Sequence, residues 1–124
     1  MDEMATRLSW KILPEPVARE WFKLPLTFTK EEGEKLRRGH IPRVMEDRWF
    51  VFYENEWLHF CRSWTGAHIY GLNIVDTPNG MQSSECWASR DPEHYHNILM
   101  DQDKALLSEI ISFVLECDPS DDWW

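Results

Sequence analysis

The sequence predicts an α+β domain in which an antiparallel meander sheet of four or more strands is packed by a C-terminal helix and a short N-terminal helix. Two observations support this prediction. Aromatic and β-branched segments follow one another between residues 49 and 89, with only short polar turns between them. Residues 106–115 instead carry apolar side chains at three- and four-residue steps, which is the spacing of one helix face.

The first 28 residues show no clear periodic pattern. They hold three prolines among large apolar side chains that include Trp10, Trp21 and Phe22. Proline removes a backbone donor and interrupts regular elements. We therefore expect an irregular arm, or short elements, laid on the core.

A short helix is expected after this arm. Thr29 and Glu32 have the spacing of a capping box, in which the two residues satisfy each other's backbone N–H groups. Gly39 supplies a stop signal, so the helix ends by that residue.

Four strands are expected in the middle of the chain. Residues 49–53 and 57–62 form a hairpin around the polar turn 54–56. Residues 67–75 and 81–89 follow, with a turn between them. Because consecutive antiparallel strands need no crossover helix, the strands form a meander.

A helical turn and a longer helix follow the sheet. Asp91 is a helix cap, with Pro92 at the first helical position. The last helix starts at Asp101 or Asp103, and its apolar face lies on the sheet. That face consists of Leu106, Leu107, Ile110, Ile111, Val114 and Leu115.

The length of 124 residues is that of a single domain. Within it we distinguish an N-terminal arm with a short helix (1–40), the sheet with the C-terminal helix (41–117) and an acidic tail (118–124). No apolar run approaches the roughly 20 residues that a membrane span requires. The acidic N-terminus has no apolar stretch behind it, unlike a secretory signal. We therefore expect a cytoplasmic protein that has no membrane partner.

Cysteine usage predicts neither a disulfide frame nor a metal site. Cys61, Cys86 and Cys117 are an odd number of thiols and lie far apart. Reduced thiols fit this pattern better than zinc ligands, which usually come in close pairs. We expect no metal and no cofactor.

The net charge of −9 is unevenly distributed. Residues 1–40 have a charge balance of +1, whereas residues 41–124 have a balance of −10. An acidic field repels a phosphate backbone, so nucleic-acid binding is disfavoured and a basic protein partner is favoured. Solubility alone is the simpler explanation of the same charge.

Arg62 is a candidate anion receptor. Strand alternation places it at the end of an apolar row with Leu58 and Phe60, where its planar guanidinium suits a carboxylate or a phosphate. Arg90 would join it at one end of the sheet, beside a helix start that favours anions. The alternatives are a structural salt bridge for Arg62 and a solvated Arg90 beside the Asp91 cap.

Ser63, Trp64, Thr65 and Gly66 follow as a compact turn. Eight tryptophans are many for a domain of this size, and they favour an aromatic binding surface in addition to the core. Here two hydroxyls, an indole that stacks on rings and a glycine that lets the backbone approach a ligand stand together. The alternative is a strand bulge with a packed tryptophan.

These segments resemble a small bacterial domain family. Its pattern is Asp-Arg-Trp before an aromatic strand, His-Phe-x-Arg-Ser-Trp-Thr-Gly, an Ile-Tyr strand and a later Arg-Asp-Pro-Glu-x-Tyr; here these fall at residues 47–49, 59–66, 69–70 and 90–95. Cys61 stands where the family usually has an aromatic residue or a histidine. The family occurs alone and as the tail of ADP-ribosylglycohydrolase-like proteins, which implies a ligand related to ADP-ribose or another nucleotide.

The favoured interpretation is a small non-catalytic module that binds an ADP-ribose-like or other nucleotide-derived anion. Its candidate ligand-binding residues are Arg48, His59, Arg62, Ser63, Trp64, Thr65, Arg90, Asp91 and Tyr95.

Two alternatives stay open. One is an acidic interaction protein, such as an immunity protein, an antitoxin or a phage-borne inhibitor, that binds a basic protein partner. The other is a hydrolase acting on an ADP-ribosyl bond, with His59, Asp91 and Glu93 as candidate acid and base. We favour a protein without catalysis, because the sequence has no P-loop, dinucleotide fingerprint or nucleophile elbow.

Overall fold

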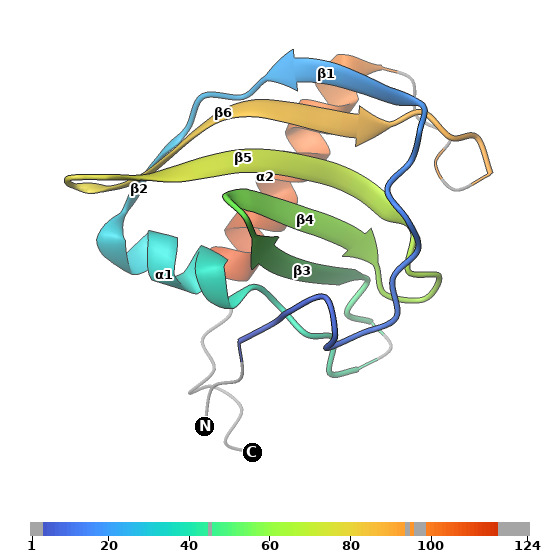
Figure 1. Ribbon diagram of the computed structural model, residues 1–124, viewed down its shortest axis with the longest axis horizontal. Coiled ribbons are helices and arrows are strands. Elements are labelled where there is room, and N and C mark those ends of the chain that lie inside the picture. Colours follow the sequence, from blue (N-terminus) through green and yellow to red (C-terminus); the bar gives the residue numbers. More distant parts are fainter. Residues whose placement is uncertain (1–3, 45, 94, 96–98, 117–124) are drawn as a thin grey trace.

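One antiparallel sheet and two helices make up the part of the chain that this computed structural model describes, residues 4–44, 46–93, 95 and 99–116 (Figure 1). The strands are β1 (Arg19–Lys23), β2 (Thr27–Thr29), β3 (Trp49–Glu54), β4 (Trp57–Arg62), β5 (His68–Thr77) and β6 (Gly80–Ser89). The helices are α1 (Lys30–Arg38) and α2 (Met100–Glu116). The predicted α+β class, with a short N-terminal and a C-terminal helix, is confirmed.

The N-terminal segment enlarges the predicted four-stranded sheet. The strand order is β1-β6-β5-β4-β3, and β2 also pairs with β6. β1 lies along residues 85–89 and β2 along residues 80–82. Between them, the Ser83 hydroxyl donates to Leu24 O at 2.6 Å and accepts from Leu26 N at 2.8 Å. Residues 19–29 are therefore the edge of the sheet, whereas residues 4–18 form the irregular arm.

The predicted meander is present with small differences in strand length. β3 and β4 form the expected hairpin, in which Trp49 lies opposite Arg62. Its turn residues Asn55 and Glu56 have φ angles of +54° and +67°, the signs that a two-residue hairpin turn requires. β5 extends to Thr77 and β6 begins at Gly80. The turn between these strands is therefore shorter than the expected turn of residues 76–80.

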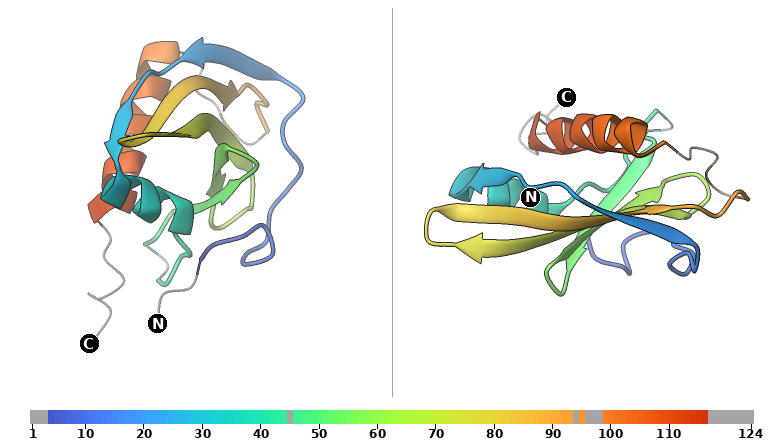
Figure 2. Two further views of the ribbon diagram at one scale, coloured as in Figure 1. Left: turned by 60° about the vertical axis from the view of Figure 1, so that its left-hand side comes forward. Right: turned by 90° about the horizontal axis from the view of Figure 1, so that it is seen from above.

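Strand alternation produces two apolar faces. On one face Leu58 and Phe60 belong to the main core, which α2 covers (Figure 2). On the other face Phe50 and Phe52 form a smaller cluster with arm residues that include Trp10. The arm passes over this second face, so both sides of the sheet are covered in part.

The helix signals in the sequence are also confirmed. Thr29 Oγ1 accepts from Glu32 N at 3.1 Å, and Glu32 Oε1 accepts from Thr29 N at 2.9 Å, which completes the capping box of α1. α2 begins at Met100, next to the predicted start. Asp91 O accepts from Tyr95 N at 2.9 Å, so the expected helical turn there is a single turn that precedes α2.

Some expectations fall outside the described residues. These are the acidic tail 118–124 and the environment of Cys117. Within the described part of the chain, neither helix combines the length and the apolar character needed to span a bilayer.

Candidate functional site

The segment 62–66 is a tight turn between β4 and β5. Arg62 O accepts from Gly66 N at 2.8 Å, and Arg62 N donates to Ala67 O at 2.9 Å. Gly66 has a φ of +81°, and a Cβ there would lie 2.9 Å from Lys11 O, so only glycine lets the arm approach this turn. Thr65 is exposed, and its Oγ1 accepts from Ala67 N at 3.2 Å. This turn is where the arm docks.

Ser63 joins three segments at this turn. Its N–H donates to Arg48 O at 2.9 Å and its hydroxyl donates to Asp47 O at 2.7 Å. Its carbonyl oxygen accepts from Trp10 Nε1 at 2.7 Å. Because Ser63 is only 2% exposed and these three groups are all hydrogen-bonded, it positions its neighbours rather than offering free polar groups.

Arg62 lies on the main-core face, as the alternation predicts. Its guanidinium stands over the ring of Trp49, with the guanidinium carbon 4.6 Å from the ring centroid. Trp49 in turn stacks on Tyr70 at 6.0 Å between centroids. A cation held over an indole face is a favourable contact that needs no carboxylate.

Arg90 is held in ion pairs with two elements. Its Nη2 lies 2.5 Å from Asp103 Oδ2 in α2 and 2.8 Å from Glu20 Oε1 in β1. Asp103 Oδ1 also accepts from the Tyr95 hydroxyl at 2.7 Å, and the Tyr95 hydroxyl is hydrogen-bonded to that of Tyr70. Burial raises the pKa of Tyr70, so this cluster keeps its phenol protonated.

Five residues of the resembling segments therefore belong to one connected cluster at one end of the sheet: Trp49, Arg62, Tyr70, Arg90 and Tyr95. β4 and β6 are both antiparallel to β5, so Arg62 and Arg90 end parallel strands on either side of it. Trp49, Tyr70 and Asp103 connect the two arginines beneath α2. Neither arginine lines the pockets described below.

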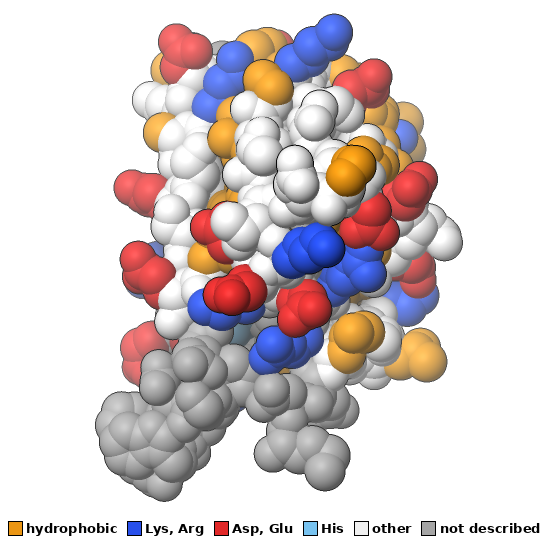
Figure 3. Space-filling model, turned by 90° about the vertical axis from the view of Figure 1, so that its left-hand side faces the viewer, with side chains coloured by type: hydrophobic (Ala, Val, Ile, Leu, Met, Phe, Trp, Pro, Cys, Tyr) orange, Lys and Arg blue, Asp and Glu red, His pale blue; other side chains and the backbone are white. Residues whose placement is uncertain are grey.

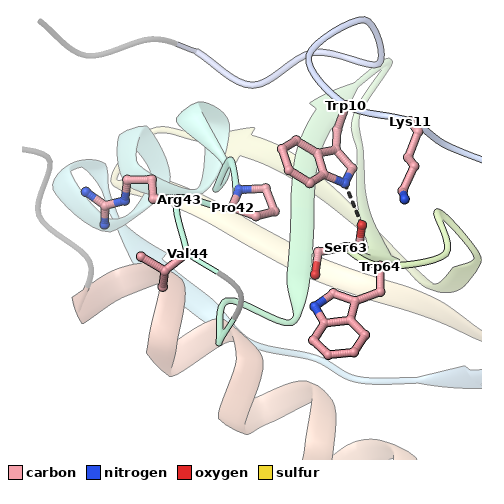
Figure 4. Close-up of a pocket in the computed structure, with 7 residues that line it drawn as sticks. All are labelled: Trp10, Lys11, Pro42, Arg43, Val44, Ser63 and Trp64. Atoms are coloured by element: carbon pink, nitrogen blue, oxygen red, sulfur yellow. Dashed lines mark hydrogen bonds between the residues drawn. The ribbon is translucent and has the colours of Figure 1, made fainter.

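A pocket of about 610 Å³ opens beside the turn, between the arm and the chain that leads into β3 (Figure 4). The described residues that line it are Trp10, Lys11, Pro42, Arg43, Val44, Ser63 and Trp64. Trp10 and Trp64 lie on two sides of Ser63, and Pro42, Arg43 and Val44 lie together on one side of them (Figure 4). Trp64 is 63% exposed, so much of its indole surface is accessible from solvent.

The charge of this pocket differs from that of the chain. Its lining includes the cations Lys11 and Arg43 and no carboxylate among the described residues. The protein as a whole has a net charge of −9. Cations therefore line this pocket although the chain as a whole is acidic.

The remaining predicted site residues lie apart from this pocket. Arg48 is exposed and meets the turn through its backbone oxygen, and Tyr95 is buried in the Asp103 cluster. Asp91 lines a separate pocket of about 310 Å³, and its Oδ1 accepts from Glu93 N at 3.0 Å. His59 lines a third pocket, so these side chains do not converge on one centre.

His59 is buried on the second face of the sheet. It stacks on Phe52 at 4.6 Å between centroids and meets the edge of His68 at 5.4 Å. Burial lowers its pKa to about 4, and the neighbouring His68 adds to this shift. Its imidazole is therefore neutral at pH 7. Of the three residues suggested for a hydrolase, Asp91 and Glu93 thus share one turn, whereas His59 lines a different pocket.

The described part of the chain has no cluster of metal-binding side chains, and its cysteines are buried. There, no group of three or more His, Cys, Asp or Glu side chains is arranged to hold a metal ion. Cys61 and Cys86 are buried free thiols, and burial raises the pKa of each.

Surface charge is mixed at the end of the molecule where α1 meets the β5–β6 turn. Lys and Arg side chains alternate there with Asp and Glu, and hydrophobic side chains are scattered (Figure 3). Arg37 of α1 pairs with Asp76 of β5. On this face, therefore, acidic side chains do not form a patch of their own. The binding of a basic protein partner stays a prediction.

Sequence reasoning missed Trp10, Lys11 and Arg43 as pocket residues. Their only signal is that a tryptophan and two cations lie outside regular elements, and nothing local pairs them with Trp64. Comparisons with family models, with curated proteins and with solved structures found no match to this chain. The resemblance described above stays a prediction.

Proposed function

We propose that this protein is a small-ligand-binding module whose site is the pocket between Trp10 and Trp64. The ligand would combine a planar ring with an anionic group, as ADP-ribose and other nucleotide-derived anions do. The observation that supports this proposal is the lining of the pocket, which has two tryptophans and two cations without a carboxylate among its described residues.

Size and chemistry agree with such a ligand. The volume of about 610 Å³ lies within the range of small-molecule sites. An indole stacks on a nucleobase of any identity and contributes about 1–3 kcal/mol per base. Trp64 is the accessible indole, whereas the Trp10 N–H is already bonded to Ser63 O. Lys11 and Arg43 would then meet the phosphates.

The proposal gives two different roles to four of the predicted site residues. Trp64 would contact the ligand. Ser63, which is hydrogen-bonded to Trp10, would hold Trp64 in position. Arg62 and Arg90 would hold the end of the sheet together through Trp49 and Asp103, and would not touch the ligand.

Calorimetric titration with AMP, ADP-ribose and NAD tests this proposal. We expect binding by at least one of them in the micromolar to millimolar range, and weaker binding of adenosine and of inorganic phosphate, since each lacks one half of the recognised chemistry. Binding should weaken as salt rises, because the cations are at an open surface. Trp64→Ala and Lys11→Glu should each reduce the affinity about tenfold or more.

Trp21→Ala is the matched control, because Trp21 is also a half-exposed indole but lies outside this pocket. It should leave nucleotide binding unchanged. The proposal is wrong if none of the three nucleotides binds at millimolar concentration, or if Trp64→Ala binds them as well as the unaltered protein does.

A further inference from the structure

A second pocket, of about 380 Å³, opens on the face of the sheet opposite α2. Three tryptophans from three strands line it: Trp21 in β1, Trp57 in β4 and Trp87 in β6. Trp21 lies opposite Trp87 in the sheet, and Trp87 lies opposite Gly71. A Cβ at Gly71 would be 2.2 Å from Trp87 Nε1, so the missing side chain makes room for this indole.

The rings of this pocket do not form a slot for a planar group. Trp21 and Trp57 meet at 84° with 5.9 Å between their centroids. Two perpendicular rings in contact cannot sandwich a base between them. They form a corner, which offers apolar surface to a thicker, saturated ring.

The charged rim of the pocket is balanced. Arg7 Nε lies 2.8 Å from Glu54 Oε2, and Arg19 Nη1 lies 3.1 Å from Glu15 Oε2. These four side chains cancel in formal charge, so the rim has no net attraction for an ion. They still present N–H donors and carboxylate acceptors to hydroxyl groups.

Arg19 already lies over two of the indole rings, those of Trp21 and Trp87. The guanidinium carbon of Arg19 lies 5.4 Å from the ring centroid of Trp21 and 5.1 Å from that of Trp87. A cationic ligand would have to displace it, since this is the position that a cation takes over indoles. The pocket therefore disfavours cations as well as anions.

A residue in the wall of the pocket has a buried polar atom without a hydrogen-bond partner among the described residues. His59 lines the pocket and is 6% exposed, and its Nδ1 is buried with no hydrogen-bond partner in the described part of the chain. A buried polar atom without a partner is costly.

We propose that the pocket of Trp21, Trp57 and Trp87 binds a neutral saturated sugar ring. Its apolar C–H face would pack in the corner of Trp21 and Trp57, on the indole surface that Arg19 does not cover, and its hydroxyls would bond to the Arg7–Glu54 and Arg19–Glu15 pairs and to Asn55 at the rim. This site is separate from the one proposed above for nucleotides, because the two linings share no residue.

Nitrogen-15 NMR of the indole N–H groups tests the proposal. The chain has eight tryptophans, so single-tryptophan variants assign the indole signals directly. The probes are the methyl glycosides of glucose, galactose, mannose and N-acetylglucosamine, each up to about 50 mM, which covers weak binding. We expect at least one of them to shift the Trp21 and Trp57 signals in a saturable way, while the Trp64 signal stays in place.

Trp21→Ala and Trp57→Ala should each weaken this sugar binding about tenfold or more. Trp64→Ala is the control that should retain it, and the other indole signals show whether each variant is folded. The charged relatives glucose 6-phosphate and glucosamine should bind more weakly than the neutral sugar. The proposal is overturned if no neutral sugar shifts the Trp21 and Trp57 signals, if both alanine variants respond as the unaltered protein does, or if a charged relative binds more tightly.

Discussion

Asp103 in α2 accepts a hydrogen bond from Arg90 at 2.5 Å, and this contact fastens the C-terminal helix to the end of β6. Asp103 is fully buried and the Arg90 side chain is 14% exposed. Both tyrosine hydroxyls of the cluster, on Tyr70 and Tyr95, also reach Asp103. A carboxylate with this many donors is a structural centre of the domain.

Asp103→Ala should therefore destabilise the protein strongly. It would remove one of the two carboxylates that pair with Arg90 and the carboxylate that accepts from Tyr95. Breaking a buried ion pair by removing one partner typically costs about 3–5 kcal/mol. Urea unfolding measures the loss.

Arg37→Ala is the control for this variant, because the Arg37–Asp76 pair is exposed on both sides. Exposed pairs are worth about 1 kcal/mol or less. Equal losses for Asp103→Ala and Arg37→Ala would contradict the central role of Asp103.

Stability should fall as pH drops below about 6.5, because burial lowers the pKa of His59 in the folded protein to about 4 from its ordinary value of 6.5. In this window the unfolded chain binds a proton that the folded chain excludes, so acid favours unfolding. Between pH 7.5 and pH 5 the loss from His59 amounts to about 2 kcal/mol. The pKa values of His68 and His40 are lowered by burial too, so they act in the same direction.

Urea unfolding at several pH values checks this prediction. His59→Phe keeps an aromatic ring beside Phe52 and removes the titrating group, so its stability should depend less on pH over this range. An unchanged slope in this variant would show that other groups carry the dependence.

Gly71→Ala should disturb the second face of the sheet. The new methyl group would lie 2.2 Å from Trp87 Nε1, and the rigid, buried indole would have to move. Overpacking of this kind costs about 1–3 kcal/mol, and Trp87 fluorescence should change with it.

Gly33→Ala in α1 is the matched comparison for Gly71→Ala. Its methyl group would lie 2.7 Å from Met81 Cγ, which belongs to a flexible side chain. Alanine also favours a helix by about 1 kcal/mol over glycine, which offsets this crowding. If both alanine variants lose the same stability, the close approach of Trp87 to Gly71 is not the cause.

Thr29→Ala should weaken the start of α1 by about 1 kcal/mol, because it removes the side-chain acceptor of Glu32 N. Thr27→Ala is a suitable control, since Thr27 is exposed in the same short strand and caps no helix. Thermal unfolding of the two variants compares them. A loss that is no larger for Thr29→Ala than for Thr27→Ala would contradict the capping role.

The strands between residues 49 and 89 were predictable because their information is local. Alternating apolar residues and tight polar turns specify a hairpin over a few residues, and Thr29 with Glu32 specifies a helix start in the same way. The face of Arg62 also follows from alternation, since side chains change sides at every residue of a strand.

The partners of these side chains were not predictable from such patterns. Arg62 meets Trp49 across the hairpin, whereas Arg90 meets Asp103 in a helix and Glu20 in an edge strand. The number of acidic residues in the sequence does not show which carboxylate pairs with which arginine. That choice depends on how α2 crosses the sheet.

The sequence by itself therefore determined the class of fold, the meander and the helix ends, all of which depend on neighbours a few residues apart. Only the tertiary structure decided that residues 19–29 form the sheet edge, that Trp10 lies beside Trp64, and that Trp21 meets Trp57. These contacts join residues far apart in the chain, and they form because burying both apolar faces of the sheet brings the N-terminal segment back across it.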